Sequence, residues 1–169
     1  MKWLLLLTGL FCQGAYPGGD YWTRASFVEK IVLLTEWPQP GLGNASKEFV
    51  IKILGKDEFT RSLEKYYSNH KILNRTVVIL PIRSIDEAGN CQALYFPKAW
   101  DNSSREAMIQ TVRKGILTLG NTPGFGLKGV MINFIDKGNG VGFEINRKSM
   151  QNAGFKISSQ LLRAGKTLN

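Results

Sequence analysis

The chain has 169 residues, of which 43% are hydrophobic and 21% charged, and its formal net charge is +9. This length and composition exclude a disordered polypeptide and predict one globular domain with its own core. The positive charges are spread along the chain rather than gathered in a tail, and the basic excess favours an acidic protein surface, nucleic acid, anionic lipid or an anionic ligand as partner.

The first residues predict export from the cytoplasm. Lys2 gives a positively charged start, and residues 3–12 form an apolar run that is much shorter than the about 20 residues needed to span a bilayer. This pattern is typical of a secretory signal peptide, here residues 1–14, with cleavage near Gly14. A lipid attached to Cys12 is the alternative, which Phe11 disfavours because a small residue is expected before such a cysteine.

The first half of the mature chain predicts alternating helices and strands. Phe27, Ile31 and Leu34 recur at helical spacing, and the segment "EFVIKIL" alternates apolar and polar residues as a half-buried strand does. The run "TVVILPI" is nearly continuously β-branched, which predicts a strand covered on both faces. The expected elements are a helix over 26–35, a strand over 48–54, a helix within 56–70 and a strand over 76–82.

The second half continues the alternation and then changes to a hairpin. We expect strands over 92–96 and 115–119, a helix over about 102–113 that begins at the capping run "NSS", two strands over 129–135 and 141–146, and a last helix over 157–164. The predicted fold is α/β, with a mixed, partly parallel sheet, helices packed on it, and a C-terminal antiparallel hairpin plus helix.

The register of the hairpin follows from its apolar pattern. A four-residue loop from Lys137 to Gly140 pairs Phe134 with Phe143 on the apolar face and Asn133 with Glu144 on the other face. A buried carboxylate without a partner is costly, so Glu144 requires a partner or water. We expect Asn146 close to this pair at a helix start. The pair is interpreted mainly as a polar tie between the sheet and the last helix, and alternatively as a ligand site.

The sequence offers few groups for catalysis. The single histidine, His70, has no cysteine or carboxylate at ligand spacing, so we expect a surface residue at a helix end and neither a metal site nor a cofactor. Cys91 is the one cysteine of the mature chain, and we expect it reduced and buried in a strand. The segment "AGKT" lacks the earlier glycine of a phosphate loop, and the glycine-rich run "NTPGFGLKG" is interpreted as a loop, with an anion cradle as the alternative. We therefore expect a binding protein and not an enzyme.

The Trp37–Pro38 pair ends the first predicted helix. Pro38 cannot continue a helix and moves Trp37 away from helical dihedral angles. Trp37 then either covers the edge of the core, which we favour, or anchors a ligand or partner. The last helix supplies the other candidate binding residues, Ser158, Ser159 and Leu162.

Four segments, in this order, carry a family resemblance: "LLTEWP", "FVIKILGKDEF", "LTLGNTPGFGLKGVMINFI" and "VGFEINRKSMQNAGFKISSQLL". From about residue 25 to 168 the chain resembles the YfiR family of small periplasmic proteins. The resemblance implies a periplasmic, non-catalytic regulator that represses a membrane-bound diguanylate cyclase through its periplasmic sensor region. It also implies a sequestering outer-membrane lipoprotein as a second partner, and no nucleic acid.

Two departures from the family pattern are visible. Cys91 matches a family cysteine that can join a disulfide, but the mature chain has no second cysteine, and Gln92 stands where histidine is common. Regulation by an internal disulfide is therefore not expected. The alternative function is a small-ligand sensor that serves another membrane signalling protein, and a homodimer stays open.

Overall fold

The computed structural model describes residues 19–39, 42, 47–98, 100, 111, 115–138 and 140–168. The expected signal peptide and most of the helix expected at 102–113 lie outside these residues. The helices and strands, in chain order, are α1 (Gly19–Leu33), β1 (Thr35–Glu36), β2 (Glu48–Leu54), α2 (Glu58–Tyr67), β3 (Lys71–Ile72), β4 (Arg75–Ile82), the 3₁₀ helix η1 (Ile85–Ala88), β5 (Ala93–Phe96), β6 (Leu117–Gly120), β7 (Ile132–Asp136), β8 (Val141–Asn146), α4 (Arg147–Asn152), β9 (Lys156–Ile157), α5 (Ser159–Ala164) and β10 (Lys166–Leu168).

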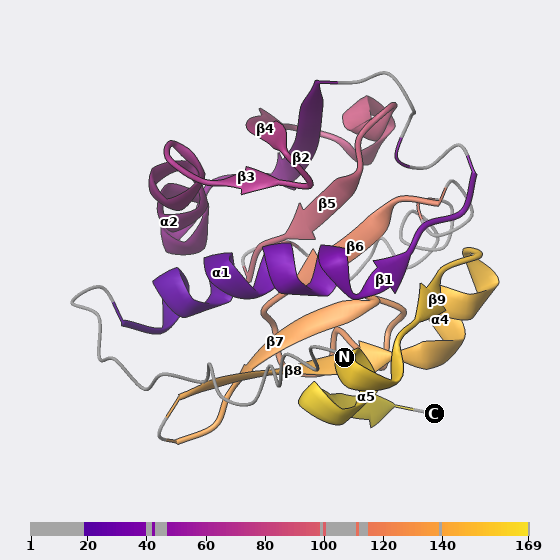
Figure 1. The fold of residues 1–169 in the computed structure, drawn as a ribbon. Coiled ribbons are helices and arrows are strands. Elements are labelled where there is room, and N and C mark those ends of the chain that lie inside the picture. The colour runs from indigo at the N-terminus through magenta and orange to yellow at the C-terminus, as the bar shows by residue number, and fades with distance from the viewer. Residues whose placement is uncertain are drawn as a thin grey trace, which may run out of the picture.

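An eight-stranded mixed sheet organises the fold (Figure 1), with strand order β10-β8-β7-β6-β5-β2-β4-β3. The neighbours from β7 through β6, β5 and β2 to β4 are parallel, whereas the β7–β8 and β3–β4 pairs are antiparallel. A second, two-stranded sheet joins β1 to β9. The predicted α/β class and the mixed sheet are confirmed.

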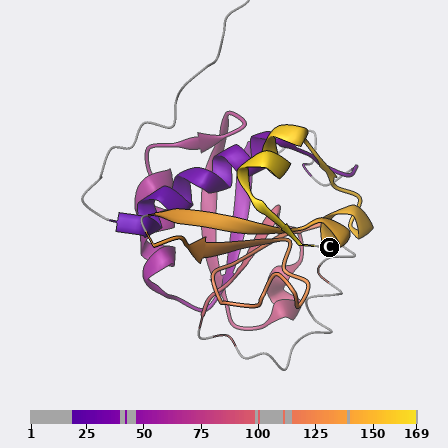
Figure 2. The ribbon, with the colours of Figure 1, turned by 90° about the horizontal axis from the view of Figure 1, so that it is seen from below.

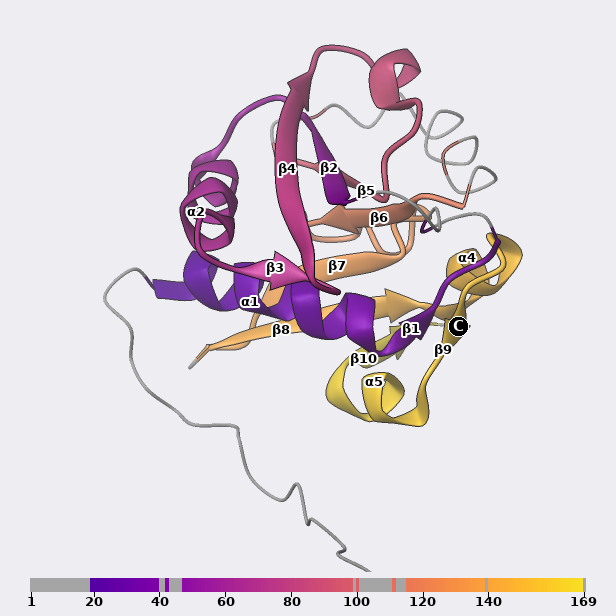
Figure 3. The same cartoon turned by 45° about the horizontal axis from the view of Figure 1, so that its top comes forward.

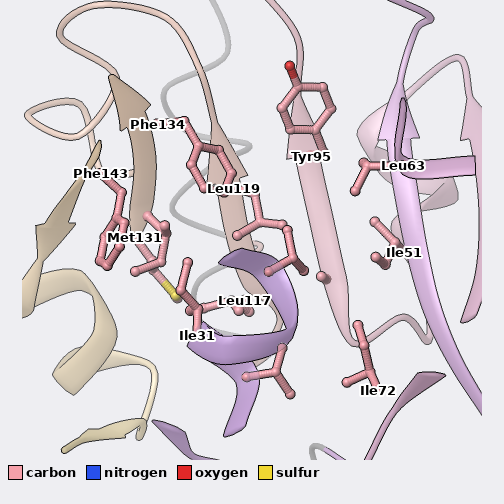
Figure 4. Packing of buried hydrophobic residues seen from close by; sticks show 14 of the residues in the cluster. Ile31, Ile51, Leu63, Ile72, Tyr95, Leu117, Leu119, Met131, Phe134 and Phe143 are labelled. Atoms are coloured by element: carbon pink, nitrogen blue, oxygen red, sulfur yellow. The ribbon is translucent and has the colours of Figure 1, made fainter. Parts of the chain in front are cut away.

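Helices α1, α2 and α5 cover one face of the sheet. Alternation along each strand sends Ile51, Ile53 and Tyr95 to this face, where they meet Ile31 and Leu63 from the helices. Figure 4 shows Ile31, Ile51, Leu63 and Tyr95 among the side chains packed in this cluster. Seen from below, α1 and α5 lie on the same side of the β7–β8 hairpin (Figure 2), which agrees with their shared apolar cluster.

The opposite face carries a smaller apolar cluster. Leu94 and Phe96 of β5 contact Phe125 and Val130 of the loop that joins β6 to β7, and Cys91 also lies in this cluster. The sheet is therefore covered on both faces at its centre. Among the described residues, no helix combines the length and apolarity that crossing a membrane requires.

The sequence placed several boundaries incorrectly. Helix α1 begins at Gly19, seven residues before the predicted start, and its early turns contribute Tyr21 and Trp22 to the core. The chain does not end on a helix, because β10 follows α5 and pairs parallel to β8. The prediction that 76–82 is covered on both faces is wrong, since Leu80 of β4 is 42% exposed and most other residues of this strand are only partly buried.

Helix α2 begins where the sequence provides a cap. The Asp57 carboxylate accepts hydrogen bonds from the Thr60 amide at 2.9 Å and from the Thr60 hydroxyl at 3.0 Å, which satisfies an amide that has no partner within the helix. The second Asp57 oxygen accepts a 2.8 Å hydrogen bond from the Tyr95 hydroxyl. This contact ties the start of α2 to the end of β5.

Candidate functional site

The β7–β8 hairpin holds the polar residues that the sequence singled out. Phe134 pairs with Phe143 and Asn133 pairs with Glu144, so the predicted register is confirmed. Asn133 is fully buried and the Glu144 side chain is 12% exposed. The hairpin therefore carries a polar pair into an otherwise apolar interior.

Hydrogen bonds satisfy the Glu144 carboxylate on both oxygens. Asn133 Nδ2 donates to Glu144 Oε2 at 3.3 Å, and Lys166 Nζ, from β10, donates to Glu144 Oε1 at 3.2 Å. Asn133 Nδ2 also donates to the Thr122 carbonyl at 3.0 Å. The partner that the carboxylate requires is thus supplied by β10, a strand that the sequence did not predict.

Asn146 extends this network to the glycine-rich loop and to a helix. Its Nδ2 donates to the Gly126 carbonyl at 2.7 Å, and its Oδ1 accepts from the Ser149 amide at 2.8 Å as the N-cap of α4. The expected helix start is confirmed, but the helix is α4 and not the last one. The network therefore ties the sheet to the loop over 121–130, to α4 and to β10.

The glycine-rich loop fits closely over this network. A Cβ atom at Gly126 would lie 2.6 Å from Leu168 Cδ1 and 3.1 Å from Glu144 Oε2, so a side chain would collide there. Glycine at this position is explained by the close approach of the loop to β8 and β10.

Three buried polar atoms beside this loop have no hydrogen-bond partner among the described residues: Asn121 Oδ1, Thr122 Oγ1 and Asn133 Oδ1. Two of them are carbonyl oxygens, which accept hydrogen bonds and repel anions. The loop is therefore better suited to a group with N–H or O–H donors than to the anion considered as an alternative from the sequence. Buried polar groups without partners are rare enough to mark a place of interest.

Trp37 lies between the first helix and the C-terminal region. Its ring is half-buried and packs edge-on against Phe49, with ring centres 6.0 Å apart, and against Phe155 at 5.0 Å. This arrangement fits the interpretation as a cover over the core. The indole Nε1 is buried without a hydrogen-bond partner in the described structure, which leaves one donor for a ligand or partner.

The candidate residues of the last helix lie near its start, where two of them support the fold. The Ser158 hydroxyl accepts from the Leu161 amide at 3.1 Å as the N-cap of α5, and the Ser158 amide donates to the Leu34 carbonyl at 3.1 Å. Ser159 is exposed, and Leu162 packs partly against the main cluster. Among the described residues, no hydrogen bond, ion pair or ring contact joins Trp37, Ser158, Ser159 or Leu162 to the Asn133–Glu144 pair, so the candidates form two groups.

Cys91 and His70, the side chains that could act as a nucleophile or a base, do not contribute reactive groups to this site. Burial raises the pKa of the Cys91 thiol from 9.0 to about 11, so the thiol is protonated at neutral pH. His70 is exposed just after α2, as the sequence predicted, and its ring stacks on Tyr66 with ring centres 4.0 Å apart. It borders an open groove of about 650 Å³ between α1 and the β3–β4 turn. In the described ranges no three His, Cys, Asp or Glu side chains gather as metal ligands would.

Sequence reasoning missed a buried cation. The Arg24 side chain of α1 is 7% exposed, forms an ion pair with Asp136 at the end of β7, and lies 5.2 Å from the centre of the Tyr21 ring. Arg24 Nε is buried and has no hydrogen-bond partner among the described residues. An arginine inside an apolar helical stripe is the signal that could have indicated this pair, because a buried charge requires a partner.

Solved structures share this fold at low sequence identity. The ABC domain in complex with L-Trp from Streptococcus pneumonia aligns with a TM-score of 0.57 and 10% identity, over 89% of this chain and 61% of that one. A conserved domain protein from Vibrio cholerae O1 biovar El Tor aligns with a TM-score of 0.59 and 11% identity, over 89% and 60%. The chain thus spans about three fifths of the structures it matches. A search of curated proteins found no match.

The family comparison covers nearly the whole described chain. Residues 21–166 match the model of a family described as YfiR/HmsC-like. These residues include Trp37, the glycine-rich loop, the Asn133–Glu144 pair and the last helix. The chain therefore belongs to the YfiR/HmsC-like family.

Proposed function

We propose that this protein is a periplasmic repressor that binds the periplasmic sensor region of a membrane-bound diguanylate cyclase and holds the enzyme inactive. The observation that carries the proposal is the match of residues 21–166 to the YfiR/HmsC-like family, because the resemblance to YfiR implies a periplasmic regulator of such a cyclase. An outer-membrane lipoprotein that sequesters the repressor would complete the system.

The charge distribution supports an acidic binding partner. Residues 137–169 contain one acidic residue, Glu144, which is already paired with Lys166. Its basic side chains are all exposed: Lys137, Arg147, Lys148, Lys156, Arg163 and Lys166. Complementary charge accelerates encounter and disfavours wrong partners more than it adds affinity. We therefore place the partner-facing surface on the region formed by α4, α5 and β10, with Trp37 beside it.

Repression requires binding that favours the inactive state of the cyclase. A ligand shifts a conformational equilibrium only by its difference in affinity for the two states. A tenfold shift requires about 1.4 kcal/mol of that difference. A single well-packed contact at the interface is sufficient for this effect, so repression needs no catalytic group in the repressor.

A binding experiment tests this function. The mature protein is labelled and titrated with the purified periplasmic region of a membrane diguanylate cyclase from the same genome. We expect saturable binding that weakens as salt is raised, because exposed charges are screened. A variant with Arg147→Glu and Lys148→Glu should bind more weakly, whereas Arg61→Glu with Lys65→Glu on α2 serves as the matched control. Absence of binding to every such region of that genome would contradict the proposal.

Unpaired buried polar atoms favour a second function, that of a small-ligand sensor. Trp37 Nε1 and Asn133 Oδ1 are a donor and an acceptor that lack partners among the described residues. A metabolite that hydrogen-bonds to either atom would raise the melting temperature of the isolated protein. The test is a thermal-shift panel of aromatic and anionic metabolites that includes L-tryptophan. The hit should lose its effect in Trp37→Phe or in Asn133→Leu.

A further inference from the structure

The outer edge of β4 carries no neighbouring strand along most of its length. β4 pairs with β2 from Thr76 to Ile82, whereas β3 pairs only with Arg75 and Thr76. Figure 3 shows β3 beside the base of β4, which continues past it towards η1. Within the described chain, residues 77–82 therefore form an open edge of the eight-stranded sheet.

The backbone groups on this edge can be assigned from the pairing. The Thr76 amide donates to the Lys47 carbonyl at 3.1 Å, on the β2 side. Successive residues of a strand direct their backbone groups to opposite sides. Val77 and Ile79 therefore direct both N–H and C=O outward, and Pro81 directs its C=O outward. The outward groups of Ile79 and Pro81 lie beyond the β3–β4 pairing, whereas the Val77 N–H directly follows that pairing and faces the residue before β3.

Pro81 supports this assignment independently. It lies in the ladder with β2, opposite Ile53, although proline cannot donate a hydrogen bond. Proline is tolerated within a sheet where the missing N–H would point to solvent at an edge. Its presence therefore agrees with an outward orientation of the odd-numbered residues and with an open edge.

The side chains next to this edge are apolar and accessible. Leu80 is 42% exposed, and Val78 beside it is only partly buried. Natural edge strands are usually protected by charges, bulges or a covering element, because open edges pair with other chains. In β4 only Pro81 and the two residues of β3 protect the edge. An apolar edge with so little protection favours a binding surface.

We infer that the open edge of β4 docks an extended segment of a partner protein, which adds a strand to the sheet. The outward N–H and C=O of Ile79 and the outward C=O of Pro81 fit an extended backbone, since main-chain hydrogen bonds supply the affinity in this mode of recognition. The exposed cations Lys71 and Arg83 lie at its two ends. The segment is therefore apolar in the middle and acidic at both ends.

A second copy of this chain fits the edge less well. Two-fold antiparallel pairing centred on Ile79 places Arg75 directly opposite Arg83 of the other copy, and like charges in that position are destabilising. In addition, β3 already occupies the outer side of Arg75 and Thr76, where the other strand would have to continue. This edge stands apart from the proposed contact region at α4, α5 and β10.

The probe is a synthetic peptide with the sequence Glu-Asp-Val-Thr-Val-Thr-Val-Asp-Glu, tested on the full mature chain. Binding is followed by fluorescence anisotropy and by amide hydrogen exchange. We expect saturable binding and slower exchange at the Ile79 amide, and weaker binding when lysines replace the acidic residues. No binding, or binding without slower exchange at this amide, overturns the inference.

Matched variants separate the backbone from the side chain. Ile79→Pro removes one outward N–H, whereas Ile79→Val keeps it with a similar loss of volume. The proline variant should bind about three- to tenfold more weakly, as expected for the loss of one hydrogen bond, and the valine variant should bind as the original protein does. Equal affinity in both variants contradicts the inference.

Two further measurements complete the test. If Ile79→Pro does not fold, Arg83→Glu is used instead, and it should weaken the preference for the acidic peptide over the lysine peptide, because Lys71 then remains as the cation at the other end of the edge. An unchanged preference contradicts the proposed acidic partner. Sedimentation is measured in parallel: a dimer of the isolated chain that depends on the Ile79 amide would assign the edge to a second copy, and would overturn the assignment to a partner.

Discussion

Asn133 and Glu144 are cross-strand neighbours in the β7–β8 hairpin, and Asn133 Nδ2 lies 3.3 Å from Glu144 Oε2. Asn133 also holds the Thr122 carbonyl of the glycine-rich loop. Asn133→Ala leaves both acceptors short of a donor in a buried place, so we expect the free energy of unfolding to fall by about 2–3 kcal/mol. Urea denaturation followed by tryptophan fluorescence measures this, with the exposed Asn152→Ala as control. A loss no larger than that of the control would show that the pair has no structural weight.

Lys166 should contribute less to the free energy of unfolding than the buried side-chain amide of Asn133. Lys166 is 63% exposed on its side chain, although it contacts a nearly buried carboxylate. Solvent screens such a pair, so Lys166→Ala should lower the unfolding free energy by only about 0.5–1 kcal/mol. The same denaturation experiment in low and high salt checks this prediction. A loss as large as that of Asn133→Ala would instead place the stabilisation in the ion pair.

Arg24 and Asp136 provide a test by double substitution. Removal of Asp136 leaves a buried cation without its carboxylate, whereas replacement of Arg24 by methionine removes the charge and keeps apolar volume. Because Asp136 is exposed, we expect Asp136→Ala to cost about 1–2 kcal/mol, and we expect this cost to disappear in the Arg24→Met background. Unfolding free energies of the four proteins measure the coupling. Additive effects of the two substitutions would contradict it.

The raised pKa of Cys91 predicts that the free energy of unfolding falls at alkaline pH. Its folded pKa of about 11 lies above the ordinary value of 9.0, so the unfolded chain releases this proton first as pH rises. The stabilisation is present below about pH 9 and is lost progressively up to about pH 11, on the order of 2 kcal/mol. Burial also raises the pKa of Tyr67 and Tyr95, which adds in the same direction.

Comparison of the protein with Cys91→Ala isolates the contribution of the thiol. The substituted protein should lose less stability between these pH values, and a thiol reagent should label the native protein slowly at neutral pH. Identical alkaline curves for the two proteins, or rapid labelling without denaturant, would contradict the burial of Cys91.

The sequence predicted those parts of the fold whose pattern is local. The apolar alternation of β2 set its bounds at Glu48 and Leu54, and the two apolar faces of the hairpin set its register. β10 was missed because "KTL" is short and polar, and its pairing with β8 depends on a partner about twenty residues away in the chain. The burial of β4 was overestimated because a continuous apolar run has the same sequence pattern in a central strand and in an edge strand.

The candidate site was predicted only in its hairpin. Asn133, Glu144 and Asn146 were found because two strands in register determine which residues face each other. Lys166 and the Gly126 carbonyl, which complete the network, come from segments whose approach depends on the tertiary fold. Arg24 was missed because it lies before the predicted start of the first helix at residue 26, and its partner Asp136 is far away in the sequence.

Substitutions of Trp37 test whether its side chain only covers the core or also contacts the cyclase. Its packing on Phe49 and Phe155 predicts that Trp37→Ala lowers the unfolding free energy by about 2–3 kcal/mol, whereas Trp37→Phe costs about 1 kcal/mol. We expect Trp37→Phe to repress the cyclase normally, because a phenylalanine still fills the space. A stable Trp37→Phe protein that no longer represses would show that the indole contacts the partner.

The central claim is that this protein keeps a membrane diguanylate cyclase inactive from the periplasmic side. The most direct measurement is the cellular level of cyclic-di-GMP in a strain that expresses the protein, after deletion of its gene and after restoration of the gene in trans. We expect the level of cyclic-di-GMP to rise on deletion and to return to its original value on restoration. Levels that stay unchanged or fall on deletion would contradict the repressor and favour the ligand sensor.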